Sequence, residues 1–268
     1  MDITKNLIKP ALVNDARPSL ISEIITDGDW NGVRPDNDKI KFDPGIPANN
    51  YEPTLAPWMS FPAMETDKQC ELVVIGGGLL GASTALHLAE SGIDTILLEK
   101  NTIGSGASGR NGGQLTPGLA RWEAESMLEN LSTDEARRLW RFTSAEAMGL
   151  IDEIAGRYDL QLDRQYGHLT AAVHPGHMNA LVQAADARKF LGDEQVTILG
   201  NYQLQDHINS DIYYGGVLDN CGGQIHSLAL NRGLIYGFLL NGGCVHGHRQ
   251  VIKIEERERK IVGSGKGA

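Results

Sequence analysis

Two short apolar runs frame the most regular stretch of the chain. The first, Leu72 to Ile75, is followed by closely spaced glycines and then by a segment rich in alanine and leucine, which favours a helix. The second, Ile93 to Leu98, ends at the carboxylate of Glu99. Short apolar runs separated by a helical segment predict a strand, a tight turn, a helix and a second strand. The stretch therefore predicts a βαβ unit.

The rest of the chain also alternates between helix and strand patterns. Ser132 and Glu135 stand in capping-box relation, which predicts a helix from there to about Tyr158. Further elements are predicted as strands at Gly167–Val173, Tyr213–Asp219, Cys244–His246 and Gln250–Glu255, and as helices at Gly176–Leu191 and Leu228–Leu240. The charged run ERERK, residues 256–260, predicts a solvated hairpin. This alternation is typical of the α/β class.

Residues 1–65 differ from everything that follows. They hold eight of the ten prolines but only three of the 32 glycines. Proline at this density prevents long helices and central strands, so we expect an extended arm with one short helix near Leu20–Ile25. The aromatic side chains of Trp30, Tyr51, Trp58 and Phe61 indicate that the arm packs on something, either its own domain or a neighbouring subunit.

Composition narrows the class of protein. The 268 residues include 24 basic and 34 acidic side chains, and the net charge of −10 argues against nucleic acid or an anionic membrane as the main partner. The cysteines Cys70, Cys221 and Cys244 have no C-x-x-C spacing, so neither a disulfide framework nor a zinc site is expected. With no signal peptide and no apolar run long enough for a bilayer, we expect a cytoplasmic protein.

The glycines of the βαβ unit carry the first chemical signal, a G-x-G-x-x-G pattern at Gly76, Gly78 and Gly81. The first glycine permits the turn off the strand, the second lets a pyrophosphate approach the backbone, and the third lets the helix lie against the sheet. Phosphates then bind at the helix N-terminus. Glu99 is placed to accept hydrogen bonds from an adenosine ribose, which disfavours NADP. The motif alone leaves FAD and NAD open.

A second glycine-rich stretch follows at residues 101–118, NTIGSGASGRNGGQLTPG. Its six glycines expose backbone N–H groups, and Ser105, Ser108, Arg110, Asn111 and Gln114 add side-chain donors. Such a stretch could wrap closely around a polar ligand. The alternative is a flexible linker, although linkers do not usually carry Arg-Asn-Gly-Gly-Gln.

Four segments together carry a family resemblance: VVIGGGLLGASTALHLAESG (73–92), LLEKNTIGSGASGRNGGQL (97–115), GGVLDNCGGQIHSLALNRG (215–233) and NGGCVHGHRQVIKI (241–254). Across residues 50–254 the sequence resembles the FAD-dependent oxidoreductases of the D-amino-acid oxidase and glycine oxidase superfamily, and within it the γ-glutamylputrescine oxidases. The resemblance favours FAD over NAD. It implies a Rossmann-like FAD-binding domain with part of a β-rich substrate domain.

The resemblance also implies roles for residues. The expected FAD contacts are Gly76, Gly78, Leu79, Leu80, Gly81, Glu99, Lys100, Ser108, Arg110, Asn111, Gly112, Gly113, Gln114 and Val251, the last holding adenine through its backbone. His226 is a candidate catalytic residue, but a structural histidine is the favoured interpretation, and Ser227 replaces the proline that relatives carry there. His246 and His248 would share a strand face, but without a nearby Cys or Asp cluster no metal site is expected.

The resemblance implies a domain division and a reaction. Residues 1–65 form the arm, 66–158 the first part of the FAD-binding domain, 159–226 a substrate-domain segment and 227–268 a return segment of the FAD-binding domain. The implied reaction oxidises a C–N bond of a small-molecule amine or amino acid, similar to γ-glutamylputrescine, by hydride transfer to flavin N5, and dioxygen reoxidises the flavin to give peroxide.

Relatives continue beyond the point where this sequence stops, so the sequence is expected to represent the N-terminal part of such an enzyme. Two alternatives stay open. One is a truncated, catalytically incompetent FAD-binding fragment. The other is the NAD-binding domain of another dehydrogenase.

Overall fold

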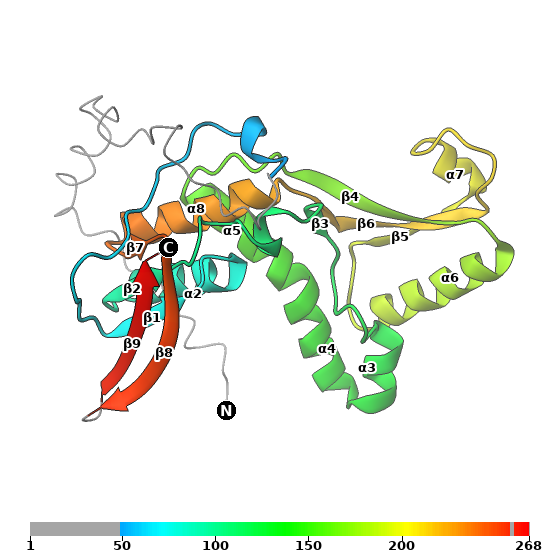
Figure 1. Ribbon diagram of the computed structural model, residues 1–268. Coiled ribbons are helices and arrows are strands. Elements are labelled where there is room, and N and C mark those ends of the chain that lie inside the picture. Colours follow the sequence, from blue (N-terminus) through cyan, green and yellow to red (C-terminus); the bar gives the residue numbers. More distant parts are fainter. Residues whose placement is uncertain (1–48, 258–259, 268) are drawn as a thin grey trace. The chain divides into compact units, whose positions relative to one another are not determined.

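The computed structural model describes residues 49–257 and 260–267 (Figure 1). The chain divides into two compact units. The first unit comprises the chain up to Asn111 and again from Ser227 onward, and the second unit comprises Gly112–His226. The short helix expected near Leu20–Ile25 and the side chain of Trp30 lie outside the described residues. Within the described residues, none of the helices combines the length and apolarity needed to cross a membrane.

The first unit is built on a parallel sheet of three strands in the order β1-β2-β7. Strands β1 (Leu72–Ile75) and β2 (Thr95–Leu98) pair in parallel and are joined by helix α2 (Leu79–Glu90), as the βαβ pattern predicts. Strand β7 (Cys244–His246) pairs with the other side of β2. This parallel arrangement confirms the expected Rossmann-like α/β fold.

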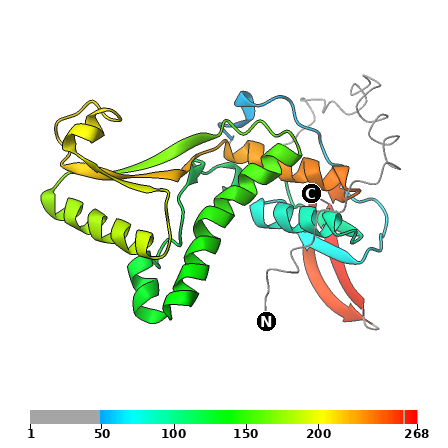
Figure 2. The same cartoon turned by 180° about the vertical axis from the view of Figure 1, so that it is seen from behind.

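The core of the first unit lies between the sheet and two helices. Helix α8 (Ser227–Leu240) lies alongside α2 in both views of the chain (Figure 1, Figure 2). The contact is close because the buried face of α2 is rich in alanine. The fully buried side chains there include Ala82, Ala85, Leu86, Leu97, Leu228, Ile235 and Phe238. Burial of this apolar surface holds the helices on the sheet.

A two-stranded hairpin ends the first unit. Strand β8 (Arg249–Arg257) pairs antiparallel with β9 (Lys260–Gly267), and residues 258–259 between them lie outside the described part. This confirms the hairpin expected at the ERERK run. Strand β8 begins where the backbone N–H of Arg249 donates to the carbonyl of Glu99 at 2.9 Å, so the hairpin is joined to the end of β2.

The end of the proline-rich arm packs on the chain's own first unit. The amide Nδ2 of Asn49 donates to the carbonyl of Gly109 at 3.0 Å. Glu52, in the 3₁₀ turn η3 (Glu52–Thr54), forms an ion pair with Arg232 of α8 at 2.5 Å. The guanidinium of Arg232 also lies 5.5 Å from the ring centre of Trp58. Of the two partners expected for the arm, the described part therefore uses its own domain.

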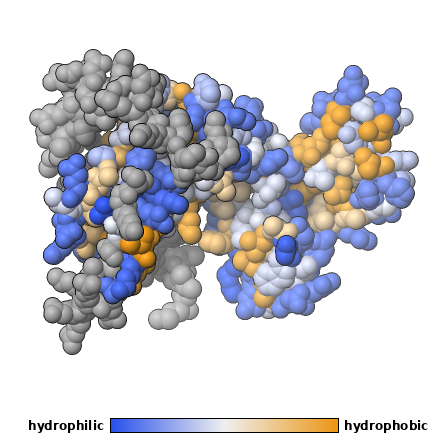
Figure 3. Space-filling view, viewed as in Figure 1, coloured by the Kyte–Doolittle hydropathy of each residue, from blue (hydrophilic) through white to orange (hydrophobic). Residues whose placement is uncertain are grey.

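The second unit is built on an antiparallel sheet. Its long central strand β6 (Gly215–Gln224) pairs with β3 (Gln114–Leu115), β4 (Gln165–Ala172) and β5 (Val196–Gly200). Helix α6 (Pro175–Phe190) connects β4 to β5, and the short helix α7 (Asn201–Gln205) follows β5. Apolar surface is visible around the end of this unit that carries α7 (Figure 3).

The predicted helix after Ser132 is confirmed together with its cap. Ser132 Oγ accepts from the N–H of Glu135, whose carboxylate accepts from the N–H of Ser132 in return. The helical stretch consists of α4 (Thr133–Arg141), a π turn η5 (Phe142–Glu146) and α5 (Ala147–Arg157). The helix α3 (Ala124–Asn130), the helix α7 and the strand β5 have no counterpart in the predicted elements.

The compact units do not divide the chain where the expected domain ranges do, apart from the boundary between residues 226 and 227. Residues 112–158 lie in the same unit as 159–226, although the expected boundary fell at 158. The reason is a core cluster that joins α3 and α4 to the end of α6: Ala124, Met127, Ala136, Trp140 and Leu191. The functional labels of the expected domains stay predictions.

Candidate functional site

The turn after β1 requires glycine at two positions. Gly76 has φ of +103°, a conformation that side chains disfavour, and its N–H donates to the carbonyl of Leu98 at 2.8 Å. A Cβ on Gly81 would lie only 2.0 Å from the carbonyl oxygen of Gly76. The helix therefore starts in direct contact with the turn, which is the geometry that the G-x-G-x-x-G spacing predicts.

The N-terminus of α2 lies beside the second glycine-rich stretch. Gly78 is the N-cap residue, and the N–H of Leu79 donates to Ser108 Oγ at 3.0 Å. A Cβ on Gly78 would approach the same oxygen to 2.8 Å. The first turn of α2 has no acidic residue, so no carboxylate opposes an anion at the positive end of the helix dipole. Leu80 is exposed there.

Glu99 lies at the end of β2 and is bound to backbone on both sides. One carboxylate oxygen accepts from the N–H of Gly77 at 2.6 Å, and the other accepts from the N–H of Asn101 at 2.8 Å. Each oxygen keeps further acceptor capacity, since a carboxylate has about four lone-pair sites. Glu99 therefore fixes the glycine turn and can still accept a hydrogen bond from a ligand. Lys100 follows with an exposed side chain.

The start of β8 lies beside the end of β2, although β8 belongs to the separate hairpin. The N–H of His248 donates to the carbonyl of Asn101 at 3.1 Å, just before β8 begins. Val251 lies in β8 opposite Gly265, beside a register shift in the hairpin. The candidate site of the first unit thus joins the glycine turn, the carboxylate of Glu99 and the first residues of β8.

Residues 101–111 fold into compact turns and do not form an extended linker. The guanidinium Nε of Arg110 donates to the carbonyl of Ser105 at 2.6 Å. The side-chain amide of Asn111 donates to the carbonyls of Ala107 at 3.1 Å and Ser108 at 2.9 Å. Both side chains expected to contact FAD therefore also hold their own loop together.

The carbonyl of Asn111 accepts two hydroxyl donors. Tyr51 Oη lies 2.9 Å from it, and Ser227 Oγ lies 3.1 Å from it. These bonds join the loop to the end of the arm and to the start of α8. Proline, the residue that the sequence resemblance leads one to expect at position 227, could not make the bond that Ser227 makes.

The remaining candidates lie in the second unit. Gly113 has φ of +70°, and a Cβ on it would lie 1.9 Å from the carbonyl oxygen of Ile225, so this position also requires glycine. Gly112 precedes it, and Gln114 lies in β3 opposite Gln224. The expected residues are therefore shared between the two units.

His226 is a buried histidine at the end of the second unit. The residue is only 9% exposed, and its backbone N–H donates to the carbonyl of Leu162 at 2.8 Å. The role of its imidazole, structural or catalytic, stays a prediction. His246 and His248 do not share a strand, because β7 ends at His246 and His248 has φ of +49°. Among the described residues, no group of three His, Cys, Asp or Glu side chains could hold a metal ion.

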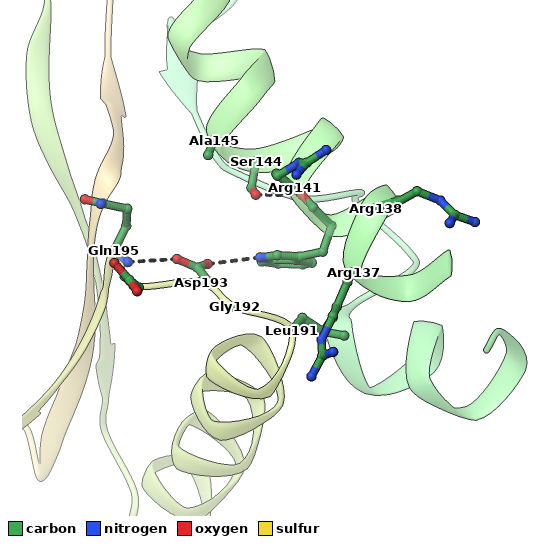
Figure 4. Close-up of a pocket in the computed structure, with 11 residues that line it drawn as sticks. Arg137, Arg138, Arg141, Ser144, Ala145, Leu191, Gly192, Asp193 and Gln195 are labelled. Carbon is green, nitrogen blue, oxygen red and sulfur yellow. Dashed lines mark hydrogen bonds between the residues drawn. The ribbon is translucent and has the colours of Figure 1, made fainter. Parts of the chain in front are cut away.

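A polar network in the second unit has no counterpart in the sequence prediction. It borders a pocket of about 420 Å³ lined by α4, the π turn η5 and the residues after α6 (Figure 4). Trp140 Nε1 donates to Asp193 Oδ2 at 3.1 Å, and Arg188 donates to the same oxygen at 2.8 Å and also to Asp219. Burial lowers the pKa of Arg188, but the bonds to Asp219 and Asp193 outweigh it and raise that pKa overall. The network joins α4, α6 and β6.

Comparison with known proteins decides the family. Residues 71–268 match the family described as DAO, FAD dependent oxidoreductase. The chain belongs to this family. The resemblance found in the sequence is confirmed, and FAD is the cofactor of the family. The match favours FAD over the alternative of an NAD-binding domain.

Individual relatives of this DAO-family chain agree with the family match. The γ-glutamylputrescine oxidoreductase of Escherichia coli K12 is 34% identical over 220 residues, which are 82% of this chain and 50% of that protein. The glycine oxidase of Geobacillus kaustophilus has a TM-score of 0.59 at 22% identity, covering 74% of this chain and 52% of that one. The L-amino acid deaminase of Proteus vulgaris has a TM-score of 0.61 at 16% identity, covering 76% and 45%. The two structures show a shared fold. The chain spans about half the length of these relatives.

Proposed function

We propose that this chain is the FAD-binding part of an oxidoreductase that acts on amines or amino acids. The diphosphate of FAD would lie at the N-terminus of α2, and the adenosine ribose at Glu99. The expected contacts are those named from the sequence: Gly76, Gly78, Leu79, Leu80, Gly81, Glu99, Lys100, Ser108, Arg110, Asn111, Gly112, Gly113, Gln114 and Val251.

The observation that carries this proposal is the junction of β1 and α2. A Cβ at Gly81 would collide with the turn, and the first turn of α2 has no acidic side chain. Backbone N–H groups at a helix N-terminus bind a diphosphate without a basic side chain. The carboxylate of Glu99 reaches the turn itself, 2.6 Å from the N–H of Gly77, which supports a ribose site at Glu99 directly beside the proposed diphosphate site.

The reaction proposed is the oxidation of a C–N bond. FAD supplies its chemistry: hydride transfer from the substrate carbon to flavin N5 and return of the electrons to dioxygen, which becomes peroxide. The chain's own residues bind and orient the cofactor. The name of the E. coli relative supports γ-glutamylputrescine or a similar amine as the substrate class.

The purified chain tests the proposal through its absorption spectrum. Bound flavin gives yellow protein, and Gly78→Val should abolish flavin retention because a branched side chain would occupy the space of the diphosphate. Gly156→Val is the matched control, since a Cβ there meets no atom within 4 Å.

Two results would count against the proposal. A Gly78→Val chain that stays as yellow as the parent would refute the diphosphate assignment. A folded but colourless parent chain would instead favour the truncated, incompetent alternative. Peroxide release on addition of γ-glutamylputrescine, putrescine, glycine or sarcosine then ranks the substrates.

A further inference from the structure

A thiol and an imidazole lie together on β7, an outer strand of the described parallel sheet, and the ammonium group of Lys68 lies beside the thiol. Cys244 opens this strand and His246 lies two residues further on, so both side chains project from the same face. The sulfur of Cys244 lies 3.5 Å from His246 Nε2 and 3.7 Å from Lys68 Nζ. Cys244 is partly exposed, and its contact with Lys68 lies at the surface.

The surroundings of His246 fix which ring nitrogen faces the thiol. Its Nδ1 lies 3.3 Å from the carbonyl oxygen of Pro62, and a carbonyl only accepts, so Nδ1 carries the proton. Burial lowers the pKa of His246; the bond to Pro62 opposes this, and the charges of Lys68 and Arg249 add to the lowering. This lowering favours the neutral ring. Its bare Nε2 is an acceptor for the S–H of Cys244.

The other two cysteines have different surroundings. Burial raises the pKa of Cys70, and its thiol donates to the carbonyl of Leu72 at 3.1 Å. Burial, followed by the charge of Asp219, raises the pKa of Cys221. Both environments oppose the thiolate, which is the reactive form of cysteine. The three thiols of the chain therefore provide an internal comparison.

We propose that Cys244 is the nucleophilic thiol of this chain and is oxidised by hydrogen peroxide to a sulfenic acid. His246 Nε2 takes the thiol proton, and the ammonium of Lys68 stabilises the negative charge on sulfur. The sulfur electron pair attacks one peroxide oxygen, an S–O bond forms and the O–O bond breaks. The leaving hydroxide takes the proton back from His246 and departs as water. Sulfur is oxidised by two electrons, and peroxide is reduced to water.

The experiment treats the whole chain with hydrogen peroxide and dimedone, which traps sulfenic acids, and measures the adduct on each cysteine by mass spectrometry. We expect most adduct on Cys244. Lys68→Met should slow its formation about threefold, because it removes an ammonium 3.7 Å from the sulfur, and a charge near 4 Å stabilises negative charge developing there by roughly a factor of five in water. Lys189→Met is the matched control, because Lys189 is an exposed lysine of the second unit. This change should leave adduct formation at Cys244 at the parent rate.

His246→Phe keeps a ring but removes the proton acceptor, and it should also slow adduct formation at Cys244. Far-UV circular dichroism establishes whether this variant folds; if it does not, the exposed Lys68→Met variant decides alone. Equal or greater adduct on Cys70 or Cys221 would overturn the proposal. So would a Lys68→Met chain that reacts at the parent rate. Because added peroxide is the reagent, the result is independent of whether the chain holds FAD.

Discussion

The contact between the turn after β1 and the start of α2 can be tested with a single methyl group. Gly81→Ala adds a Cβ that would lie 2.0 Å from the carbonyl oxygen of Gly76. Real Cβ atoms essentially never approach a heavy atom within 3.0 Å, so the helix or the turn must move by about 1 Å. Since the obstacle is backbone, no side-chain rotation can relieve it.

The magnitude follows from two opposing effects. Alanine favours a helix over glycine by up to about 1 kcal/mol, whereas overpacking costs roughly 1–3 kcal/mol. We expect Gly81→Ala to lower the free energy of unfolding by about 1–2 kcal/mol. Gly149→Ala makes the same chemical change in α5, where a Cβ meets nothing within 4 Å, and should raise it by about 0.5–1 kcal/mol.

Urea unfolding followed by far-UV circular dichroism measures both variants, and the flavin content of each purified protein is measured alongside. Displacing the first turn of α2 also displaces the N–H groups proposed to bind the diphosphate, so Gly81→Ala should hold less flavin, while Gly149→Ala should hold as much as the parent. If Gly81→Ala and Gly149→Ala were both more stable than the parent and held equal amounts of flavin, the close contact between turn and helix would be refuted.

Three further changes test other parts of the structure. Glu99→Gln replaces one acceptor oxygen with a donor facing a backbone N–H, and should lower the free energy of unfolding in urea by about 1–3 kcal/mol. Unchanged stability would contradict the two bonds from the N–H groups of Gly77 and Asn101. Arg188→Met leaves the buried carboxylate of Asp219 without its cation and should lower the free energy of unfolding, measured in the same way, by about 3–5 kcal/mol. A loss below 1 kcal/mol would show that the ion pair is not buried in solution. Ser227→Ala removes one of two hydroxyl donors to the carbonyl of Asn111 and should cost about 0.5–1.5 kcal/mol, while Ser227→Thr, which keeps the hydroxyl, should largely preserve stability.

Features carried by local spacing were predictable from the sequence. The turn at Gly76 and the contact at Gly81 follow from glycines at fixed offsets, because each offset corresponds to one backbone position in a strand–turn–helix junction. The cap at Ser132 follows from a pair of residues three apart. In these places the sequence signal and the structural cause lie within a few residues of each other.

Features that depend on distant residues were not predictable. Arg188 and Asp219 are 31 positions apart, and neither belongs to a motif that would indicate the other. The compact units do not divide at residue 158, because Trp140 packs with Leu191, a contact that helical periodicity cannot assign to a partner. The second role of Arg110 and Asn111, bonding to carbonyls three to five residues away in their own loop, was hidden for a different reason: a polar side chain in a glycine-rich stretch looks like a ligand donor whether or not the backbone uses it.

The double role of Glu99 has a consequence for how the candidate site works. Its two oxygens already bind the N–H groups of Gly77 and Asn101, so the carboxylate is held in place by the protein and need not be ordered by a ligand. A preorganised acceptor binds a ribose hydroxyl without losing side-chain freedom, which favours affinity. The same bonds mean that removing the carboxylate weakens the turn and the acceptor together. Stability and flavin affinity should therefore fall in parallel in Glu99 variants, whereas Gly78→Val should lose flavin with a much smaller change in stability. A Glu99→Gln chain with full stability and no flavin would show that the carboxylate serves the ligand alone.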